Sequence, residues 1–226
     1  MIPWKLIDTA DVPGGGEPLR LMQRGKEFTI KLGQNELMSS RLYGSEEALA
    51  TLSCARLKAR PAPHLLIGGL GMGFTLRAAL KVLGQQARIT VAELVPAVIA
   101  WARGPMAELS GESLADARVD IRETDVVKLI AAARSAYDAI LLDVDNGPQG
   151  LTRQSNDALY DPAGLRAAFT ALRPGGVLAV WSSHPDERFA PRLHKAGFAA
   201  EEIKIRATGK GGGGARHVIW IATRPA

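Results

Sequence analysis

Residues 64–73 read His-Leu-Leu-Ile-Gly-Gly-Leu-Gly-Met-Gly, and a pattern typical of a helix, Phe74–Leu83, follows them directly. The apolar run Leu65–Ile67 is the kind that a strand buried on both faces shows. Apolar residues then recur at helical spacing up to a stop at Gly84. Glycine permits a tight turn and lets the backbone approach a ligand closely. Strand, turn and helix together therefore predict the first unit of a nucleotide-binding α/β fold.

Further strand candidates follow this glycine turn, at Arg88–Leu94, Val119–Thr124, Tyr137–Leu142 and Gly176–Trp181. The first of these ends near Glu93, and the next two end at Asp125 and Asp143. Because ligands bind beyond the carboxyl ends of the strands in an open parallel sheet, these acids should share one crevice with the glycine turn. Any one of them could equally be a helix N-cap or a loop acid. Their succession at the strand ends favours a binding site.

Helix patterns separate the strand candidates, at residues 45–58, 126–134, 162–172 and 187–196. Ser45 is the expected N-cap of the first helix, with two glutamates in its first turn. Two more strand patterns, Phe198–Ala207 and His217–Thr223, come last. The segment between them is too short for a crossover helix, so we expect them to pair antiparallel. The sequence thus predicts a doubly wound α/β protein with a mostly parallel sheet and an antiparallel C-terminal hairpin.

The first forty residues differ from the rest of the chain. Leu19–Gln23 and Glu27–Leu32 predict a β hairpin, and Glu36–Met38 predicts a third short strand. We therefore divide the chain into an N-terminal β-hairpin region, residues 1–43, and an α/β domain, residues 44–226. Two or three strands bury little surface alone, so this region should pack on the main domain, on a partner chain, or on both. Its free strand edges suggest a homodimer.

The composition fits a globular protein of 226 residues that is 46% hydrophobic and carries a net charge of +5. Its basic residues are scattered rather than gathered in a dense stripe, so we expect no nucleic-acid partner. The sequence contains no apolar run of membrane-spanning length and no visible signal peptide, so we expect a cytoplasmic protein without a membrane partner. The single cysteine, Cys54, falls in a predicted helix, and we interpret it as a small core residue.

Several of these residues together resemble the class I AdoMet-dependent methyltransferase fold, which is Rossmann-like. They are the turn Gly69–Gly73, the acids Glu93, Asp125 and Asp143, and the segment Leu172–Gly176. The predicted C-terminal hairpin supports the resemblance, because dinucleotide-dependent dehydrogenases do not usually end in that way. AdoMet-dependent transferases do.

Within that superfamily the chain more closely resembles the spermidine synthase group, the polyamine aminopropyltransferases. N-terminal β hairpins precede the donor-binding domain in that group, as they do here. Thr75-Leu76-Arg77 follows the glycine turn, as in that group. The segment Asp143–Pro148, which reads DVDNGP, occupies the place of the group's Asp-rich, Gly-Pro-containing catalytic loop. The resemblance implies a transferase and is consistent with a homodimer.

For the donor, the resemblance implies S-adenosylmethionine or its decarboxylated form. The turn glycines Gly69, Gly71 and Gly73 would pass close to the sulfonium tail of this donor. Glu93 would hold the ribose hydroxyls, and Asp125 would accept a hydrogen bond from the adenine amino group. These roles agree with the position of Glu93, which lies about 20 residues past the glycines, where such folds place a ribose-binding acid.

For the acceptor, the resemblance implies a small amine. Asp143 and Asp145 would be catalytic, with Asp143 facing the amine, where a carboxylate can take its proton or orient it for in-line attack. From their positions, Tyr160 could line the acceptor pocket or be a plain surface aromatic, and Trp181 should lie at the mouth of the crevice. Glu46 could reach the acceptor amine in the same pocket, although helix-start electrostatics explains it equally well. We expect no metal, because no His/Cys cluster suggests one.

Met72 departs from the pattern of the group, because it stands where the synthases carry an aspartate that helps bind the donor's aminopropyl ammonium. A methionine is compatible with intact AdoMet, whose carboxylate an acid would repel. Ser45-Glu46-Glu47 likewise stands where the group has Tyr-His-Glu. Three alternatives therefore stay open: aminopropyl transfer, AdoMet-dependent methyl transfer to a small molecule, and a non-catalytic binding protein that retains the fold.

Overall fold

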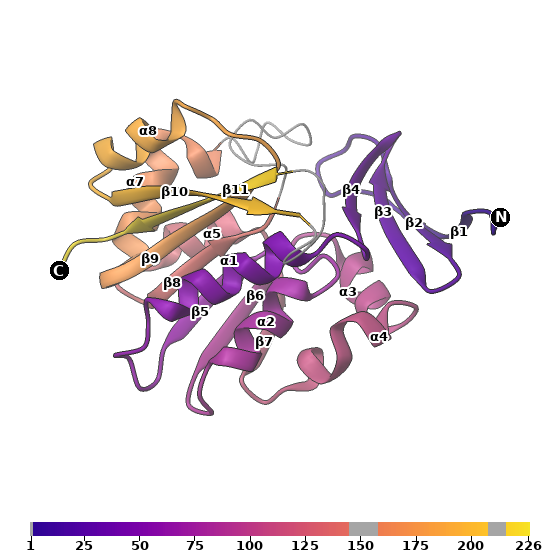
Figure 1. The fold of residues 1–226 in the computed structure, drawn as a ribbon, viewed down its shortest axis with the longest axis horizontal. Coiled ribbons are helices and arrows are strands. Elements are labelled where there is room, and N and C mark those ends of the chain that lie inside the picture. Colours follow the sequence, from indigo (N-terminus) through magenta and orange to yellow (C-terminus); the bar gives the residue numbers. More distant parts are fainter. Residues whose placement is uncertain (1, 145–157, 208–215) are drawn as a thin grey trace.

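The computed structural model of the chain describes residues 2–144, 158–207 and 216–226 (Figure 1). Its main sheet has seven strands in the order β10-β11-β9-β8-β5-β6-β7. Their bounds are β5 His64–Gly68, β6 Arg88–Glu93, β7 Val119–Glu123, β8 Tyr137–Leu142, β9 Leu172–Ser182, β10 Ala199–Arg206 and β11 Arg216–Thr223. The strands from β7 to β9 pair in parallel, whereas β11 is antiparallel to both β9 and β10. The predicted parallel sheet and C-terminal hairpin are therefore confirmed.

The strand order reverses between β5 and β8. From β5 the chain first builds outward through β6 and β7, and then returns to place β8 on the other side of β5. The last paired residues of these two central strands are Gly68 and Leu142. A ligand crevice in an open α/β sheet forms beyond the carboxyl ends of the strands at such a reversal. The fold therefore puts its natural binding position directly over the glycine turn.

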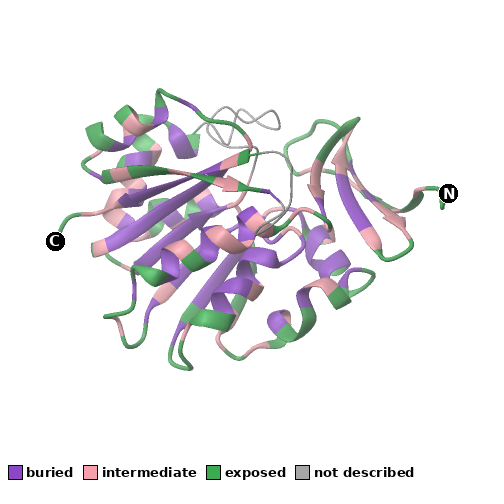
Figure 2. Ribbon diagram, in the orientation of Figure 1, coloured by how far each residue is buried: buried purple, intermediate pink, exposed green. Residues whose placement is uncertain are grey.

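Helices cover both faces of the main sheet (Figure 2). They are α1 Gly44–Ala55, α2 Phe74–Val82, α3 Pro96–Arg103, α4 Ala107–Ser110, α5 Val126–Ala132, α7 Pro162–Ala171 and α8 Phe189–Lys195, with a 3-10 helix at Gly111–Ala115. Alternate strand residues enter different cores: Leu65 and Ile67 pack in the core with α1 to α3, and Leu66 packs in the core with α5, α7 and α8. This alternation explains why the central strands are apolar on both faces.

The N-terminal sheet consists of four antiparallel strands in sequence order. They are β1 Lys5–Ala10, β2 Leu19–Arg24, β3 Glu27–Leu32 and β4 Asn35–Ser39. The predicted hairpin and third strand are confirmed. Strand β1 was not predicted, and its side chains are exposed or half-buried, so it carries no buried face that a sequence pattern would reveal.

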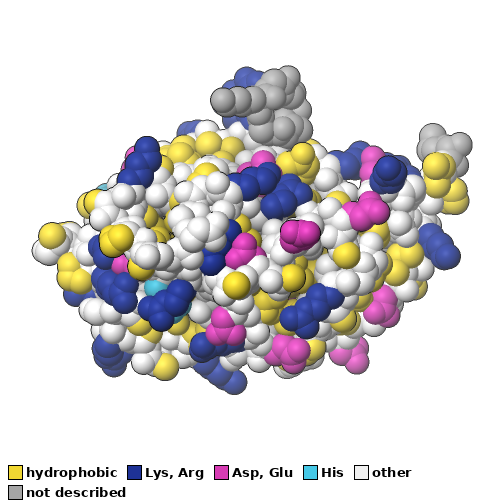
Figure 3. Space-filling model, turned by 90° about the horizontal axis from the view of Figure 1, so that it is seen from below, with side chains coloured by type: hydrophobic (Ala, Val, Ile, Leu, Met, Phe, Trp, Pro, Cys, Tyr) yellow, Lys and Arg dark blue, Asp and Glu magenta, His cyan; other side chains and the backbone are white. Residues whose placement is uncertain are grey.

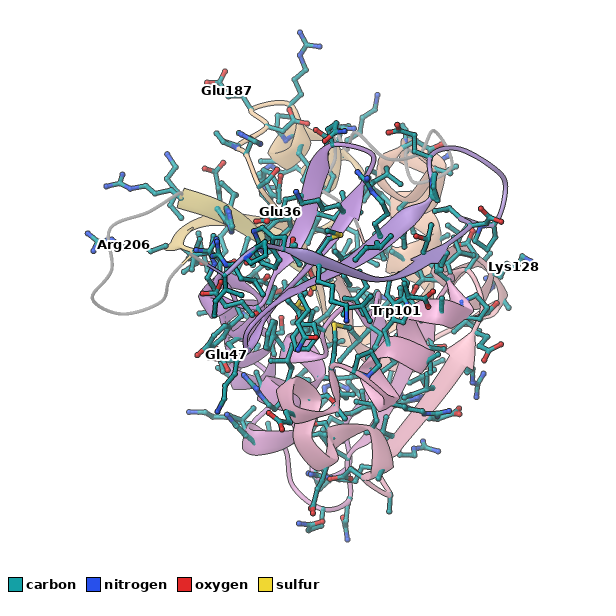
Figure 4. All side chains as sticks on the ribbon, turned by 90° about the vertical axis from the view of Figure 1, so that its right-hand side faces the viewer. Glu36, Glu47, Trp101, Lys128, Glu187 and Arg206 are labelled. Atoms are coloured by element: carbon teal, nitrogen blue, oxygen red, sulfur yellow. The ribbon has the colours of Figure 1, made fainter. Side chains whose placement is uncertain are left out.

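The N-terminal sheet packs on the main domain. Four of its residues, Leu19, Leu21, Phe28 and Ile30, belong to the same buried core as α1, α2 and α3. Figure 4 shows Trp101, from α3, at the boundary between the two parts, where its indole Nε1 donates a hydrogen bond to Asp8 Oδ2 at 2.7 Å. Of the placements expected from the sequence, packing against the main domain is therefore the one that the structure shows.

Two local predictions were wrong. The first helix begins at Gly44 with Tyr43 in the N-cap position, so Ser45 lies inside the helix and caps nothing. The strand expected at Gly176–Trp181 begins earlier than predicted. Strand β9 starts at Leu172, which pairs with Tyr137, and the register then shifts before Val177. The Pro-Gly-Gly sequence is accommodated as an irregularity within the strand rather than as a break before it.

No helix among residues 2–144, 158–207 and 216–226 is both long and apolar enough to span a bilayer.

Candidate active site

The glycine turn joins β5 to α2 and lies against the end of β8. Gly69, Gly71 and Gly73 have φ angles of +87°, +50° and +80°, in the region that favours glycine. A Cβ atom on Gly69 would lie 2.3 Å from the carbonyl oxygen of Asp143. The Asp143 amide in turn donates a hydrogen bond to the Gly68 carbonyl at 2.9 Å. The turn and the residue that follows β8 therefore approach each other more closely than side chains would allow.

Glu93 ends β6 and holds the glycine turn from the other side. Its Oε2 accepts a hydrogen bond from the Leu70 amide, and its Oε1 accepts one from the Val95 amide, both at 2.9 Å. The residue is 7% exposed, and this burial raises the pKa of its carboxyl group. Hydrogen bonds from backbone amides, those of Gly71 and Leu94 included, oppose this rise in pKa. Glu93 thus shapes the turn and also lines the cavity described below.

Asp125 follows β7 and caps α5. Its Oδ1 accepts a hydrogen bond from the Val127 amide at 2.9 Å. This is the N-cap role that the sequence left open as an alternative. The carboxyl group is half-buried and also lines the cavity, so the capping role and a position in the site coexist.

A cavity of about 200 Å³ lies between the carboxyl edge of the main sheet and the N-terminal sheet. The structure brings the predicted residues Gly69, Gly71, Glu93, Asp125 and Asp143 together on its wall. Gly73 is not part of the lining, and instead occupies the N-cap position of α2. The opposite wall is formed largely by apolar side chains of the N-terminal sheet, namely Leu19, Ile30, Leu32, Leu37 and Met38. This second wall was not predictable from the sequence, because a hairpin pattern does not say what its buried face will contact.

Met38, from β4, closes over the glycine turn. Its Sδ accepts a hydrogen bond from the Met72 amide at 3.2 Å, and a Cβ on Gly71 would lie 2.6 Å from its terminal methyl group. Met72 itself is fully buried in the core, and its side chain does not line the cavity. The thioether that faces the cavity is therefore that of Met38, not that of the residue singled out in the sequence.

The cavity is acidic. Every charged residue among its described lining residues is a carboxylic acid, and these acids are Glu17, Glu46, Glu93, Asp125 and Asp143. The described lining contains no lysine, arginine or histidine. A cavity of this kind favours cationic ligands and disfavours anionic ones.

Glu46 and Asp143 form an electrostatically coupled pair. The Thr75 hydroxyl lies 2.6 Å from Asp143 Oδ2 and 3.4 Å from the carbonyl oxygen of Glu46, so the start of α1 lies beside the end of β8. Burial, and then the charge of Asp143, raise the pKa of Glu46 to about 8. Burial raises the pKa of Asp143 to about 6, opposed by its hydrogen bond from Thr75. Near neutral pH the pair therefore shares about one proton.

The remaining predicted residues lie elsewhere or outside the described chain. Tyr160 was expected in the acceptor pocket, but it is 2% exposed, packs edge-on against Phe189 at 5.8 Å between ring centroids, and is not among the lining residues. The reason is that its ring fills the core beneath α7 and α8. Asp145 lies outside the described residues. Trp181, at the end of β9, does line the cavity.

Comparison with known proteins agrees with this architecture. Residues 45–190 match the family described as the spermine/spermidine synthase domain. The chain belongs to the spermine/spermidine synthase family. The matched segment begins in the first turn of α1 and reaches α8, so it contains Glu46, the glycine turn and Asp143.

Curated relatives of the family are similar over part of their length. The chain is 30% identical over 123 residues to a polyamine aminopropyltransferase of Prochlorococcus marinus strain MIT 9215, a match that covers 54% of this chain and 41% of the relative. It is 29% identical over 122 residues to a polyamine aminopropyltransferase of Sulfolobus acidocaldarius, covering 54% of this chain and 39% of that one. The chain thus matches about two fifths of the length of these relatives.

Solved structures of spermidine synthases share the fold. The spermidine synthase from Thermotoga maritima superimposes with a TM-score of 0.76 at 18% identity, covering 97% of this chain and 73% of that one. A spermidine synthase in complex with the transition-state analogue AdoDATO gives 0.75 at 18% identity, covering 97% and 72%. The coverage extends to the N-terminal sheet, so both parts of the molecule belong to the shared fold.

Proposed function

We propose that this chain is an aminopropyltransferase that takes the aminopropyl group of decarboxylated AdoMet and transfers it to a small amine. The observation that carries the proposal is the charge of the cavity, in which all charged residues among the described lining are acids. Both proposed ligands are cationic: the donor carries a sulfonium and an ammonium group, and amine acceptors are ammonium ions near neutral pH. Family membership supports the same reaction.

The choice between the two donors follows from the same charges. Intact AdoMet carries a carboxylate at its tail. The charged residues of the described lining are all acids, so they would repel this group. Decarboxylated AdoMet lacks that group and keeps the ammonium. Met72 is compatible with the intact donor, but its side chain is buried away from the cavity and so does not select between the two donors. We therefore propose that the acids of the cavity replace the aspartate missing from the glycine turn. The comparisons lend no support to methyl transfer or to a non-catalytic binding protein.

We propose the following chemistry. The acceptor enters as an ammonium ion and gives one proton to Asp143 of the carboxyl pair. The neutral nitrogen attacks the methylene carbon next to the sulfonium. A nitrogen–carbon bond forms as the carbon–sulfur bond breaks, and the sulfur keeps the bonding pair and becomes a neutral thioether. Glu93 and Asp125 are proposed to hold the ribose and the adenine. The acidic wall stabilises the positive charge that passes from sulfur to nitrogen.

Among the described residues, no group of three or more His, Cys, Asp or Glu side chains is arranged to hold a metal ion. The proposed reaction needs none, because the sulfonium already activates its neighbouring carbon.

A direct comparison of donors tests the proposal. Calorimetry on the purified chain is expected to give at least about tenfold tighter binding of decarboxylated AdoMet than of AdoMet, a difference of about 1.4 kcal/mol. Incubation with a panel of diamines and polyamines is then expected to release methylthioadenosine together with an aminopropylated amine, both detectable by mass spectrometry. Tighter binding of the intact donor, or a methylated product, would refute aminopropyl transfer.

The variant Asp143→Asn tests the proposed base. We expect kcat to fall by about 10²–10⁴-fold, because the amide cannot take a proton. Methylthioadenosine, which is uncharged, should still bind with unchanged affinity. Asp120→Asn is the matched control, because Asp120 lies on β7 in an exposed ion pair with Arg122 and outside the cavity lining. An Asp143→Asn enzyme as active as the Asp120→Asn control would remove Asp143 from the mechanism.

A further inference from the structure

A hydrogen-bonded chain leads from the cavity to the C-terminal hairpin. Glu46 Oε2 lies 2.7 Å from the hydroxyl oxygen of Ser45, and the same oxygen lies 2.8 Å from Nδ1 of His217. These residues come from the first turn of α1 and from β11, which are far apart in the sequence. Neither Ser45 nor His217 is among the cavity-lining residues, and the proposed chemistry gives neither a role.

The burial of its three members shows which end of this hydrogen-bonded chain lies inside the protein and which end is open to water. Ser45 is fully buried and Glu46 is 5% exposed, whereas His217 is half-buried. Glu46 faces the cavity at one end, and His217 is the one member with substantial surface open to water at the other. A buried hydroxyl between a carboxyl group and an imidazole can donate to either of them and accept from the other. Such an arrangement can pass a proton without moving any heavy atom.

We propose that Ser45 and His217 form the outward half of a proton path, which carries the proton of the acceptor amine from the Asp143–Glu46 pair to water. The path rests on the proposed function, because aminopropyl transfer to an ammonium ion releases one proton in each turnover. Asp143 and Glu46 line the cavity. Ser45 and His217 act through Glu46 and are positioning residues.

Each proton that moves along these hydrogen bonds can be accounted for. Protonated Glu46 donates to the Ser45 oxygen, whose own proton is donated to Nδ1 of His217. Transfer along both bonds leaves Glu46 as a carboxylate, Ser45 as a hydroxyl that now points to Glu46, and His217 as an imidazolium ion. The imidazolium loses its Nε2 proton to water and becomes the neutral ring with its hydrogen on Nδ1. The starting state returns in three steps. Asp143 passes to Glu46 the proton that it took from the amine, the Ser45 hydroxyl rotates, and the ring proton of His217 moves from Nδ1 to Nε2 through water.

The surroundings of His217 favour this role. The ring lies edge-on to Trp181, at 4.8 Å between centroids, and its backbone pairs with Ile205 of β10. The ionisable groups that face it are Glu46, through Ser45, and His184. Burial, and then the charge of His184, lower the pKa of His217, so the ring is neutral near neutral pH and can accept a proton.

The pH dependence of catalysis tests the path in the full-length enzyme. For Ser45→Ala and His217→Gln we expect kcat to fall about tenfold near pH 7. The deficit should shrink toward zero near about pH 10, where the acceptor enters as a free amine and has no proton to lose. The double variant should be no slower than either single variant, because both interrupt one path. Binding of methylthioadenosine should change by less than about twofold.

Matched controls separate a proton path from damage to the fold. Ser53→Ala removes another buried hydroxyl of α1, one that donates to the Leu49 carbonyl at 2.7 Å. His194→Gln removes an exposed histidine of α8. Neither control should show a pH-dependent deficit. A deficit of equal size at every pH, or one that the controls reproduce, would overturn the path. A wild-type enzyme that forms no product from any amine would instead overturn the proposed function.

A measurement that needs no turnover tests the coupling itself. Ionised Glu46 accepts from Ser45, so His217 must carry its hydrogen on Nδ1, whereas protonated Glu46 reverses both bonds and places that hydrogen on Nε2. Long-range ¹H–¹⁵N spectra should therefore show the neutral ring of His217 changing tautomer as Glu46 titrates, close to its pKa of about 8. This inflection should vanish in Glu46→Gln and in Ser45→Ala. A tautomer that is insensitive to pH in the wild type, or an inflection that survives both substitutions, would refute the path whatever the activity.

Discussion

Single residues at this site combine structural and chemical duties. Glu93 holds the glycine turn through the Leu70 amide, and Asp125 caps α5, yet both also line the cavity. The sequence could predict that these acids would converge, because strand ends meet at one edge of a parallel sheet. The sequence could not show whether such an acid caps a helix or lines a binding site, because the carboxyl group of Asp125 caps α5 and also lines the cavity.

Gly69 leaves no room for a side chain. In Gly69→Ala the Cβ would lie 2.3 Å from the Asp143 carbonyl oxygen, on a backbone with φ of +87°. We expect a loss of at least about 2 kcal/mol in the free energy of unfolding, from left-handed strain and from the displaced β8 end. Binding of methylthioadenosine should weaken in parallel. Gly84→Ala is the control, because its Cβ would meet nothing within 4 Å, and urea denaturation of both variants checks the contrast.

Glu46 should make stability depend on pH in an unusual direction. Its pKa is raised to about 8 by burial and by Asp143, so the folded protein holds a proton that the unfolded chain releases. The stabilising effect is complete below the unfolded pKa of about 4.3 and is lost as pH rises through the folded value. Stability should therefore fall between about pH 5 and pH 8, with a slope of at most about 1.4 kcal/mol per pH unit for this proton.

Glu46→Gln should flatten that dependence, because a neutral amide neither gains nor loses the proton. Urea unfolding at several pH values in this range measures the difference between the two proteins. Glu47→Gln is the matched control, since Glu47 is the next residue of the same helix and pairs with Arg77 at 3.1 Å. An equally steep fall in Glu46→Gln would show that other groups cause the pH dependence.

At the scale of elements, the parallel strands and the C-terminal hairpin were predictable and the details between them were not. Apolar runs and strand-end acids sufficed for β5, β6, β8 and the second half of β9, because strands buried on both faces leave a strong signal. The exposed strand β1 left no such signal. The irregular start of β9 was also hidden, because proline and glycine normally end a strand, and here the register shift absorbs them.

Strand β4 is expected to contribute to ligand binding although it lies outside the α/β domain. Met38 contacts Gly71 and the Met72 amide, so Met38→Ala removes part of the cavity wall and the sulfur that accepts that amide's hydrogen bond. We expect methylthioadenosine binding to weaken about five- to tenfold, roughly 1–1.4 kcal/mol. Leu6→Ala on β1 is the control, because Leu6 is 50% exposed. Equal affinities in the two variants, measured by calorimetry, would mean that the wall does not contact the nucleoside.

The division of the chain at residues 43 and 44 and the homodimer stay predictions. The N-terminal sheet shares one buried core with α1 to α3, which argues that residues 1–43 do not fold alone. Sedimentation of the full chain would settle the oligomeric state.

The molecule as a whole carries a positive net charge, whereas its cavity is lined by acidic side chains. The net charge is +5, while the described cavity lining contains acids alone among its charged residues. On the face shown in Figure 3, basic side chains are interspersed with acidic ones rather than gathered in one patch. A cationic substrate therefore gains attraction only near the site, where the low-dielectric walls of the cavity concentrate the field.

This contrast predicts how salt affects the enzyme. We expect kcat/KM for a diamine acceptor to fall about three- to tenfold as NaCl is raised from about 0.01 M to about 0.3 M, because salt screens attraction to the acidic cavity. The change should lie in KM rather than in kcat. Repeating the series with Na₂SO₄ at equal ionic strength controls for specific ions. A rise in kcat/KM with salt would indicate that the positive net charge governs the encounter instead.

The antiparallel direction of β11 has a consequence for how the protein is made. This strand follows all the others along the described chain, yet it inserts between β9 and β10, and its first residues bring His217 beside Ser45. Until the ribosome has released β11, the position between β9 and β10 in the sheet is empty. The Glu46–Asp143 pair then lacks the imidazole of His217 beside Ser45. A nascent chain can therefore bring the glycine turn and its neighbouring acids together early, but His217 reaches Ser45 only after β11 has been made.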